Sequence, residues 1–109
     1  MSTDCTYSLM DGERQHRDYP DSFFIPCSLS RYNVRVGMHV KVGINVTPRI
    51  DGKGDRLWFK VIAVQHNKKG VAEYVGICEN NPIVVDGYMR LGGELRFQPQ
   101  HVLEILENR

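Results

Sequence analysis

The central segment of the chain, residues 56–79, contains the feature that most constrains the fold. Two apolar runs, RLWFKVIAVQ and VAEYVGICE, flank the short polar segment HNKKG. Both runs are rich in β-branched and aromatic residues, which favour strands. Residues 67–70 suit a tight turn in which Gly70 adopts a left-handed backbone conformation. The sequence therefore predicts an antiparallel β-hairpin at its centre.

Alternating apolar residues predict the partners of this hairpin. Residues 38–46 alternate valine and isoleucine with more polar side chains, which indicates a half-buried strand. We expect residues 38–46, 57–65 and 71–78 to be antiparallel neighbours in one bent sheet. A further short strand is expected at 94–97. The side chains expected to face the core are Val42 and Ile44 on the first strand and Leu57, Phe59, Val61 and Ala63 on the second.

The two ends of the chain are expected to differ from this strand-rich middle. Residues 1–22 are polar and predict an irregular N-terminal arm. Residues 27–32 suit a single helical turn, and Pro99 suits the first turn of a closing helix over 100–107. The anchor of the arm on the core is expected to be the apolar group Phe23, Phe24 and Ile25.

Together these elements predict a mainly β fold with a minor α+β character. The expected domain, residues 23–109, is a single small β-barrel-like unit. It is either a strongly bent antiparallel sheet or an SH3-like, partly open barrel, with a short C-terminal helix. A chain of 109 residues is long enough for one small hydrophobic core.

Composition disfavours several classes of protein. No apolar run approaches the roughly 20 residues of a membrane span. The N-terminal sequence lacks the basic-then-apolar pattern of a signal peptide. We therefore expect a soluble, cytoplasmic protein without a membrane partner. The cysteines have no zinc-binding spacing, so we expect free thiols, no metal and no cofactor; they are Cys5, Cys27 and Cys78.

The charge distribution leaves two classes of partner open. The net charge is +1, but residues 22–70 contain nine basic and two acidic side chains between acidic flanks. One coherent basic face would favour nucleic acid, whereas interspersed charge would favour a protein partner.

The candidate binding surface centres on Trp58, the single tryptophan of the chain. With Lys60 on the same strand and Tyr74 on the next, it predicts an aromatic and basic surface. Arg56 and Lys41 would add positive charge to this surface. The alternative is that Trp58 is a core aromatic residue covered by the N-terminal arm.

Two further positions are candidates for partner contact. Asn80 and Pro82 follow the return strand and form either a recognition loop or a turn in which Asn80 caps its own backbone. His101 is a candidate contact or general base, but no acid or nucleophile is tied to it by spacing. We predict instead that its imidazole satisfies a backbone group at the start of the closing helix. No catalytic residue and no metal ligand is predicted.

The order of five motifs resembles that of a known family. The motifs FFIP, VGMHVKV, DRLWFKV, YVGICENNP and LGGELRFQPQHVLEI follow one another across residues 23–105. In this order and spacing they resemble the YegJ-like bacterial domains of unknown function. Members of that family often have Gly-Asp before the last strand, where this chain has Gly92, Gly93 and Glu94. The resemblance implies a bacterial β domain but no activity, because the function of the family is unassigned.

The sequence lacks a catalytic triad, a metal-binding spacing and a nucleotide fingerprint. This favours a non-enzymatic bacterial binding or interaction module, of immunity or accessory type, whose partner is another protein. The alternative is single-stranded nucleic-acid binding by a basic, aromatic barrel face. A third hypothesis is a small hydrolase that uses His101 and an acid such as Asp86.

Overall fold

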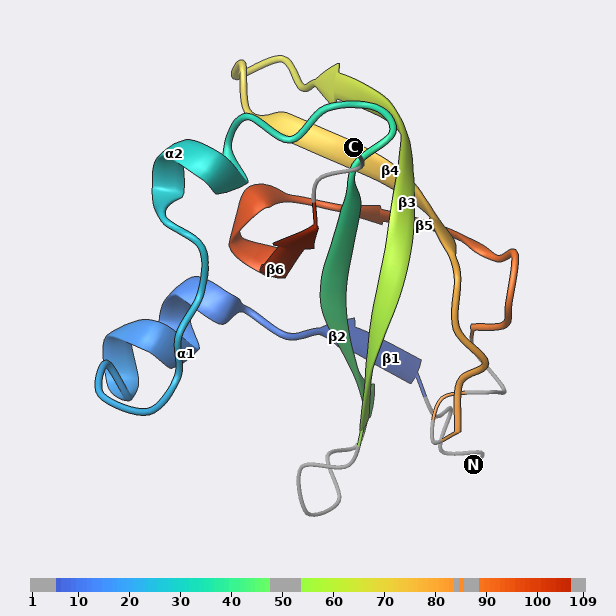
Figure 1. The fold of residues 1–109 in the computed structure, drawn as a ribbon, viewed down its shortest axis with the longest axis horizontal. Coiled ribbons are helices and arrows are strands. Elements are labelled where there is room, and N and C mark those ends of the chain that lie inside the picture. The colour runs from blue at the N-terminus through green and yellow to red at the C-terminus, as the bar shows by residue number, and fades with distance from the viewer. Residues whose placement is uncertain (1–5, 48–53, 84, 86–88, 107–109) are drawn as a thin grey trace.

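The computed structural model describes residues 6–47, 54–83, 85 and 89–106, and within them the chain is mainly β (Figure 1). Its strands are β1 (Thr6–Leu9), β2 (His39–Thr47), β3 (Gly54–His66), β4 (Ala72–Cys78), β5 (Glu94–Phe97) and β6 (Val102–Leu106). Its helical elements are α1 (Gly12–Asp18), α2 (Ser28–Arg31) and the 3₁₀ turn η1 (Pro99–His101). The predicted fold class is confirmed.

Strand β2 joins the two ends of the described chain. The strand order of the antiparallel sheet is β1-β2-β3-β4-β5, and β6 also pairs with β2. One edge of β2 takes two partners, β6 along residues 39–42 and β1 along residues 44–47. The other edge pairs with β3 over residues 39–45. The sheet therefore curls into a half-barrel (Figure 1).

The β3–β4 hairpin forms as predicted. Gly70 has a φ of 78°, a left-handed conformation that glycine adopts without steric cost. The Oδ1 atom of Asn67 accepts hydrogen bonds from the backbone N–H groups of Lys69 (2.8 Å) and Val71 (2.9 Å). Strands β2, β3 and β4 are antiparallel neighbours in the expected order.

A bulge in β3 changes which side chains face the core. The register with β4 shifts between Val61 and Ala63, and Ile62 is left 44% exposed. Before the bulge Phe59 and Val61 are completely buried, as predicted. After it Val64, rather than Ala63, packs against the core, because the extra residue reverses the alternation of the strand. The prediction for Ala63 is therefore wrong.

The core lies inside the half-barrel. Its aromatic centre is Phe97, whose ring centroid lies 6.1 Å from that of Phe59 and 5.7 Å from that of Tyr74. Tilted ring pairs at these distances add to the stabilisation from burial. The predicted core residues Val42 and Ile44 are buried beside them, which confirms that face of β2.

The C-terminal segment is a strand and not the expected helix over 100–107. After η1 the chain runs along β2 as β6. An irregularity in the register at Lys41 and Val42 allows the adjacent residues Val102 and Leu103 both to be buried. Strand β6 also satisfies backbone groups of β2 that a helix would leave unpaired. Residue 107 lies outside the described residues.

The N-terminal arm also differs from the prediction. Residues 6–9 pair with β2, and residues 12–18 form α1. The Oδ1 atom of Asp11 caps this helix by accepting a hydrogen bond from the N–H of Arg14 (3.0 Å). The expectation of an irregular arm is wrong for these residues, while residues 1–5 lie outside the described part of the chain.

Candidate functional site

The outer face of the sheet, which we define by His39, Lys41, Trp58 and Lys60, contains most of the predicted binding residues. Lys41 and Trp58 face one another across β2 and β3. The Lys41 Nζ atom lies 5.0 Å from the centroid of the Trp58 ring, a favourable position for a cation over an aromatic face. Trp58 is half-buried and does not belong to the cluster of core residues, so it is not the core aromatic residue of the alternative interpretation.

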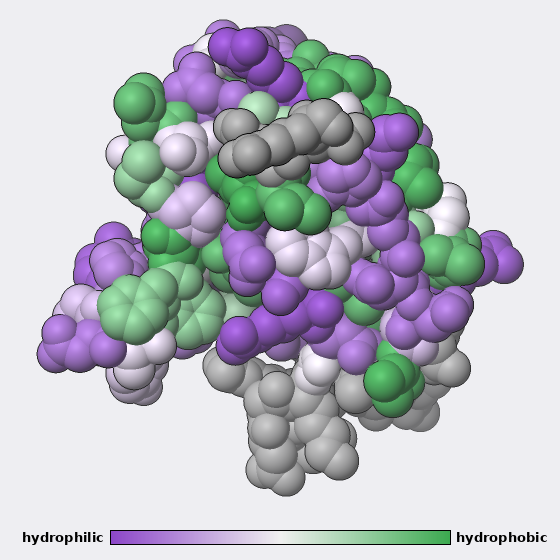
Figure 2. All heavy atoms as spheres, in the orientation of Figure 1, coloured by the Kyte–Doolittle hydropathy of each residue, from purple (hydrophilic) through white to green (hydrophobic). Residues whose placement is uncertain are grey.

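Acidic side chains interrupt the positive charge of the outer face. The Lys41 Nζ atom lies 3.5 Å from Oε1 of Glu104, and the His39 Nδ1 atom lies 2.5 Å from Oε1 of Glu79. In the orientation of Figure 1, hydrophilic and hydrophobic residues are interspersed over the surface (Figure 2). The outer face is therefore not one coherent basic surface.

Arg56 lies beside the outer face but contacts a different aromatic ring. Its guanidinium carbon lies 5.4 Å from the centroid of the Phe23 ring. Arg56, Lys41 and Phe23 line a small hollow of about 260 Å³ together with Glu104. The structure thus brings Lys41 and Arg56 together as predicted, but the hollow that they line includes Phe23 and not Trp58.

Tyr74 does not belong to the outer face. Its side chain is completely buried, and its hydroxyl donates a hydrogen bond to the carbonyl oxygen of Arg31 (2.7 Å). Burial raises the pKa of this phenol. Beyond the bulge in β3 its cross-strand neighbour is Val64. The predicted aromatic surface of Trp58 and Tyr74 is therefore wrong.

The segment after β4 is held against β3. The Asn80 Oδ1 atom accepts a hydrogen bond from the backbone N–H of Trp58 (2.6 Å). Asn80 thus caps the neighbouring strand, and the prediction that it caps its own backbone is wrong. Pro82 is half-buried beside Ile83, whose N–H donates to Oδ2 of Asp55 (3.1 Å). These contacts fix the segment within the fold.

His101 makes the kind of structural contact that the sequence predicted. Its ring Nδ1 atom accepts a hydrogen bond from the backbone N–H of Gln98 (3.0 Å). The backbone N–H of His101 donates to the carbonyl oxygen of Gln98 (2.9 Å). With Nδ1 as acceptor, the neutral ring carries its proton on Nε2. Burial lowers the pKa of His101. Asp86, the acid of the hydrolase hypothesis, lies outside the described residues.

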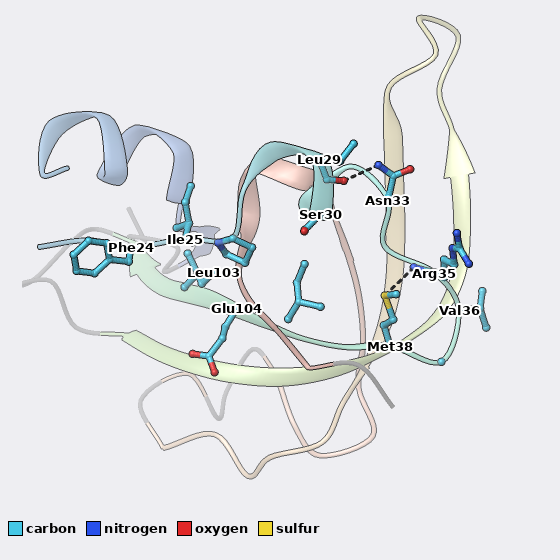
Figure 3. Close-up of a pocket in the computed structure, with 13 residues that line it drawn as sticks. Phe24, Ile25, Leu29, Ser30, Asn33, Arg35, Val36, Met38, Leu103 and Glu104 are labelled. Atoms are coloured by element: carbon cyan, nitrogen blue, oxygen red, sulfur yellow. Dashed lines mark hydrogen bonds between the residues drawn. The ribbon is translucent and has the colours of Figure 1, made fainter. Parts of the chain in front are cut away.

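A groove that the sequence did not indicate opens beside β6 (Figure 3). It is bordered by residues 24–26, α2 and residues 33–38 on one side, and by Leu103 and Ile105 of β6 on the other. The large apolar side chains along it that remain mostly exposed are Phe24 (73%), Leu29 (74%) and Val36 (62%). The prediction that Phe24 anchors the arm in the core is therefore wrong.

A buried arginine holds the upper border of the groove in place. The Nη1 atom of Arg31 donates to Oε2 of Glu13 on α1, and its Nε donates to the carbonyl oxygen of Pro26 (2.8 Å). The hydroxyl of Tyr74 binds the Arg31 carbonyl from the core. Partners of this kind are needed because a buried charge without them is costly. We call Arg31, Glu13 and Tyr74 the arginine clasp.

One edge of β6 borders the groove and has no backbone partner among the residues that the structure describes. β6 pairs with β2 along its other edge. Among residues 6–47, 54–83, 85 and 89–106, no backbone hydrogen bond joins residues 103–106 to a segment other than β2. This edge and the arginine clasp could not be predicted from the sequence, because both depend on segments far apart along the chain.

The described residues contain no cluster of three or more His, Cys, Asp or Glu side chains that could hold a metal ion. Cys27 and Cys78 are free thiols. A hydrogen bond with Ser30 lowers the pKa of the exposed Cys27, whereas burial raises the pKa of Cys78. No helix in the described part of the chain is long and apolar enough to cross a bilayer.

No protein-family model, curated protein or solved structure matches this chain. The resemblance to the YegJ-like bacterial domains therefore stays a prediction from the five motifs. The candidate site rests on the geometry of the outer face, the groove and the arginine clasp.

Proposed function

We propose that this protein is a non-enzymatic interaction module that binds another protein in the groove beside β6. The observation that carries the proposal is the exposure of Phe24, Leu29 and Val36 along this one groove. Exposed apolar side chains that gather in one place mark interaction surfaces, whereas isolated ones are ordinary.

The size of the groove favours a polypeptide over a small molecule. Its volume is about 1320 Å³, whereas small-molecule sites are typically concave spaces of about 300–1,000 Å³ that cover most of their ligand. Exposed side chains form much of its border, so a small ligand would stay largely in water. An elongated apolar segment would cover more of these side chains.

The outer face supports a protein partner over nucleic acid. Lys41 lies beside Glu104, and His39 lies beside Glu79. These carboxylates would repel phosphate groups and reduce the gain from counterion release. Interspersed charge of this kind is compatible with the polar rim of a protein interface.

An SH3-like architecture and a bacterial immunity or accessory role belong to this proposal. The return of β6 to the side of β2 after η1 supports the former, because it brings the last strand beside the first long one. The motif resemblance supports a bacterial source only. The immunity or accessory role is proposed because the sequence has no catalytic triad, metal-binding spacing or nucleotide fingerprint.

The test compares two exposed aromatic positions of the N-terminal segment. Phe24 lines the groove, whereas Tyr19 is 59% exposed and lies outside it. Immobilised wild-type protein, Phe24→Asp and Tyr19→Asp are incubated with extract of the source cell, and retained proteins are identified. We expect a protein that wild type and Tyr19→Asp retain and Phe24→Asp loses. Equal retention by all three would contradict the proposal.

Nucleic-acid binding is tested separately with a labelled single-stranded oligonucleotide at low salt. We expect no change in fluorescence anisotropy. Binding that weakens with salt and disappears in Lys60→Glu would instead favour the nucleic-acid hypothesis.

A further inference from the structure

We propose that the partner contributes an extended segment that adds as a strand to the free edge of β6, with an acidic residue placed against Arg35. This inference rests on the proposed function and specifies the mode of binding and the chemistry of the partner.

The free edge of β6 is the first reason. A strand that pairs on one side only presents unpaired N–H and C=O groups along the other, and these are a template for another strand. Within the described part of the chain β6 pairs with β2 alone, and its residues 103–105 line the groove. Edge strands are commonly protected by charged side chains. The one charged residue of β6, Glu104, is instead engaged by Lys41.

The apolar border is the second reason. Successive side chains of an extended segment point to opposite faces, so every second one would meet the same border. Leu29 and Val36 lie with Phe24 along the groove, and the pocket-lining residues Ile25 and Met38 are only partly exposed. Such a surface suits alternating apolar side chains. Backbone pairing would supply affinity, and these contacts would supply selectivity.

The charge of the groove is the third reason. Among the described residues that line it, two are charged, Arg35 and Glu104. Glu104 lies beside Lys41, whereas Arg35 forms no ion pair with another described residue. The uncompensated charge is therefore positive, and its complement is a carboxylate.

The orientation of the segment follows from the two ends of the groove. Figure 3 shows Phe24 at one end and Arg35 at the other. Leu106 at the end of β6 pairs with His39, which places the end of β6 toward Arg35. Antiparallel pairing, the more stable arrangement, would bring the beginning of the added segment to Arg35. We therefore expect the acidic residue first and the alternating apolar residues after it.

A second copy of this chain fits less well. Two β6 edges paired antiparallel would place the Arg35 end of one copy beside the Phe24 end of the other. The one carboxylate in the groove lining is already engaged by Lys41, so no complement would be supplied to Arg35.

The probes are capped, labelled peptides of about six residues. Each begins with glutamate and continues with an apolar residue alternating with threonine, the apolar residue being valine, leucine or phenylalanine. Two matched controls carry lysine in place of glutamate, or N-methyl groups on the amides that would pair with β6. Binding is followed by fluorescence anisotropy to wild type, Arg35→Glu and Lys60→Glu, the last being a charge reversal on the outer face.

We expect at least one glutamate peptide to bind wild type and Lys60→Glu about three- to tenfold more tightly than its lysine counterpart. Arg35→Glu should reverse this order. N-methylation should weaken binding by about tenfold or more. Hydrogen exchange should slow in residues 103–106 when the peptide is bound. Failure of the whole panel to bind, or N-methylated peptides that bind equally well, would overturn the inference.

These outcomes are distinguishable from failure of the proposed function. If no peptide binds but Phe24→Asp still loses the cellular partner, the interaction module stands and strand addition is wrong. If Phe24→Asp retains the partner, the groove itself is wrong. Sedimentation that shows a dimer of wild type, dissociated by Phe24→Asp, would assign the edge to a second copy and overturn the inference.

Discussion

The outer face, on β2 and β3, and the groove beside β6 differ in how many of their charged and apolar side chains find partners within the fold. On the outer face Lys41 contacts both Trp58 and Glu104, and His39 contacts Glu79. Along the groove, apolar side chains remain exposed and Arg35 has no acidic partner among the described residues. Residues whose types suggest a binding site in the sequence can thus have their side chains engaged by partners within the same chain. The better candidate is the region whose groups the fold leaves unsatisfied.

The largest effect is expected from a change beneath both regions. Phe59→Ala should lower the free energy of unfolding by about 3–5 kcal/mol, because Phe59 is completely buried against Phe97. Both regions should be lost in one cooperative transition. Urea denaturation followed by circular dichroism and by Trp58 fluorescence checks this. Transitions that do not coincide, or a loss below about 1 kcal/mol, would break the idea of a common core.

A change in the arginine clasp is expected to destabilise the border of the groove and to leave the outer face intact. Glu13→Gln would leave the buried Arg31 without its carboxylate and should cost about 2 kcal/mol. This loss is smaller than that of a fully buried pair because the Glu13 side chain is 34% exposed to solvent, which screens its charge. Hydrogen exchange should accelerate in residues 24–36 while the β3–β4 hairpin stays protected.

The matched control for the clasp is on the same helix. Asp18 lies 4.0 Å from Arg14 in an exposed pair, so Asp18→Asn should change stability by no more than about 0.5 kcal/mol. Equal losses in Glu13→Gln and Asp18→Asn would mean that the clasp does not hold the groove.

The contribution of His101 to stability should depend on pH. His101→Gln should cost about 1 kcal/mol at pH 8, since it disturbs the cap of η1. The pKa of His101 is lowered in the folded protein, so below its ordinary value of about 6.5 the unfolded chain binds more protons. The stability from the neutral ring is thus fully present above that pH and is lost as pH falls toward the folded pKa.

The stability difference between wild type and His101→Gln should therefore shrink from pH 8 to pH 5, as measured by urea denaturation. His66→Gln, at an exposed position, is the control for replacing an imidazole by an amide and is measured over the same pH range. A difference that is constant across this range would contradict a buried neutral imidazole.

The smallest effect is expected on the outer face. Lys41→Met keeps most of the side-chain stem but removes the charge near Trp58 and Glu104, and it should cost less than about 1 kcal/mol. Trp58 emission should shift because the cation beside its ring is gone. A loss above about 2 kcal/mol would show that this face contributes more to stability than its partial exposure suggests.

The β3–β4 hairpin could be predicted from the sequence because its determinants are local. Alternating side chains and the turn at Gly70 need no information from distant residues. The face of the sheet on which Tyr74 lies could not be predicted. The bulge at Ile62 reverses the alternation of β3, and no glycine or proline marks that bulge in the sequence. The strand β6 was missed for a different reason. Its apolar spacing also suits a helix, and the open edge of β2 decides between the two.

The groove was hidden because its two borders come from different parts of the chain. The apolar run FFIP suggested burial, and no local pattern distinguishes an anchor from an exposed border residue. The buried Arg31 was missed on similar grounds, since arginine is usually exposed.

The pairing of β6 with β2 also has a consequence for the order of folding. The two strands meet only after most of the described chain has been made, and contacts between such distant segments close slowly. Until then β2 presents to the cell the edge that β6 will later cover, which makes the unfinished chain prone to association. A partner that binds by adding a strand would compete with β6 for that edge during synthesis. Such a partner would therefore bind correctly only after β6 has paired with β2.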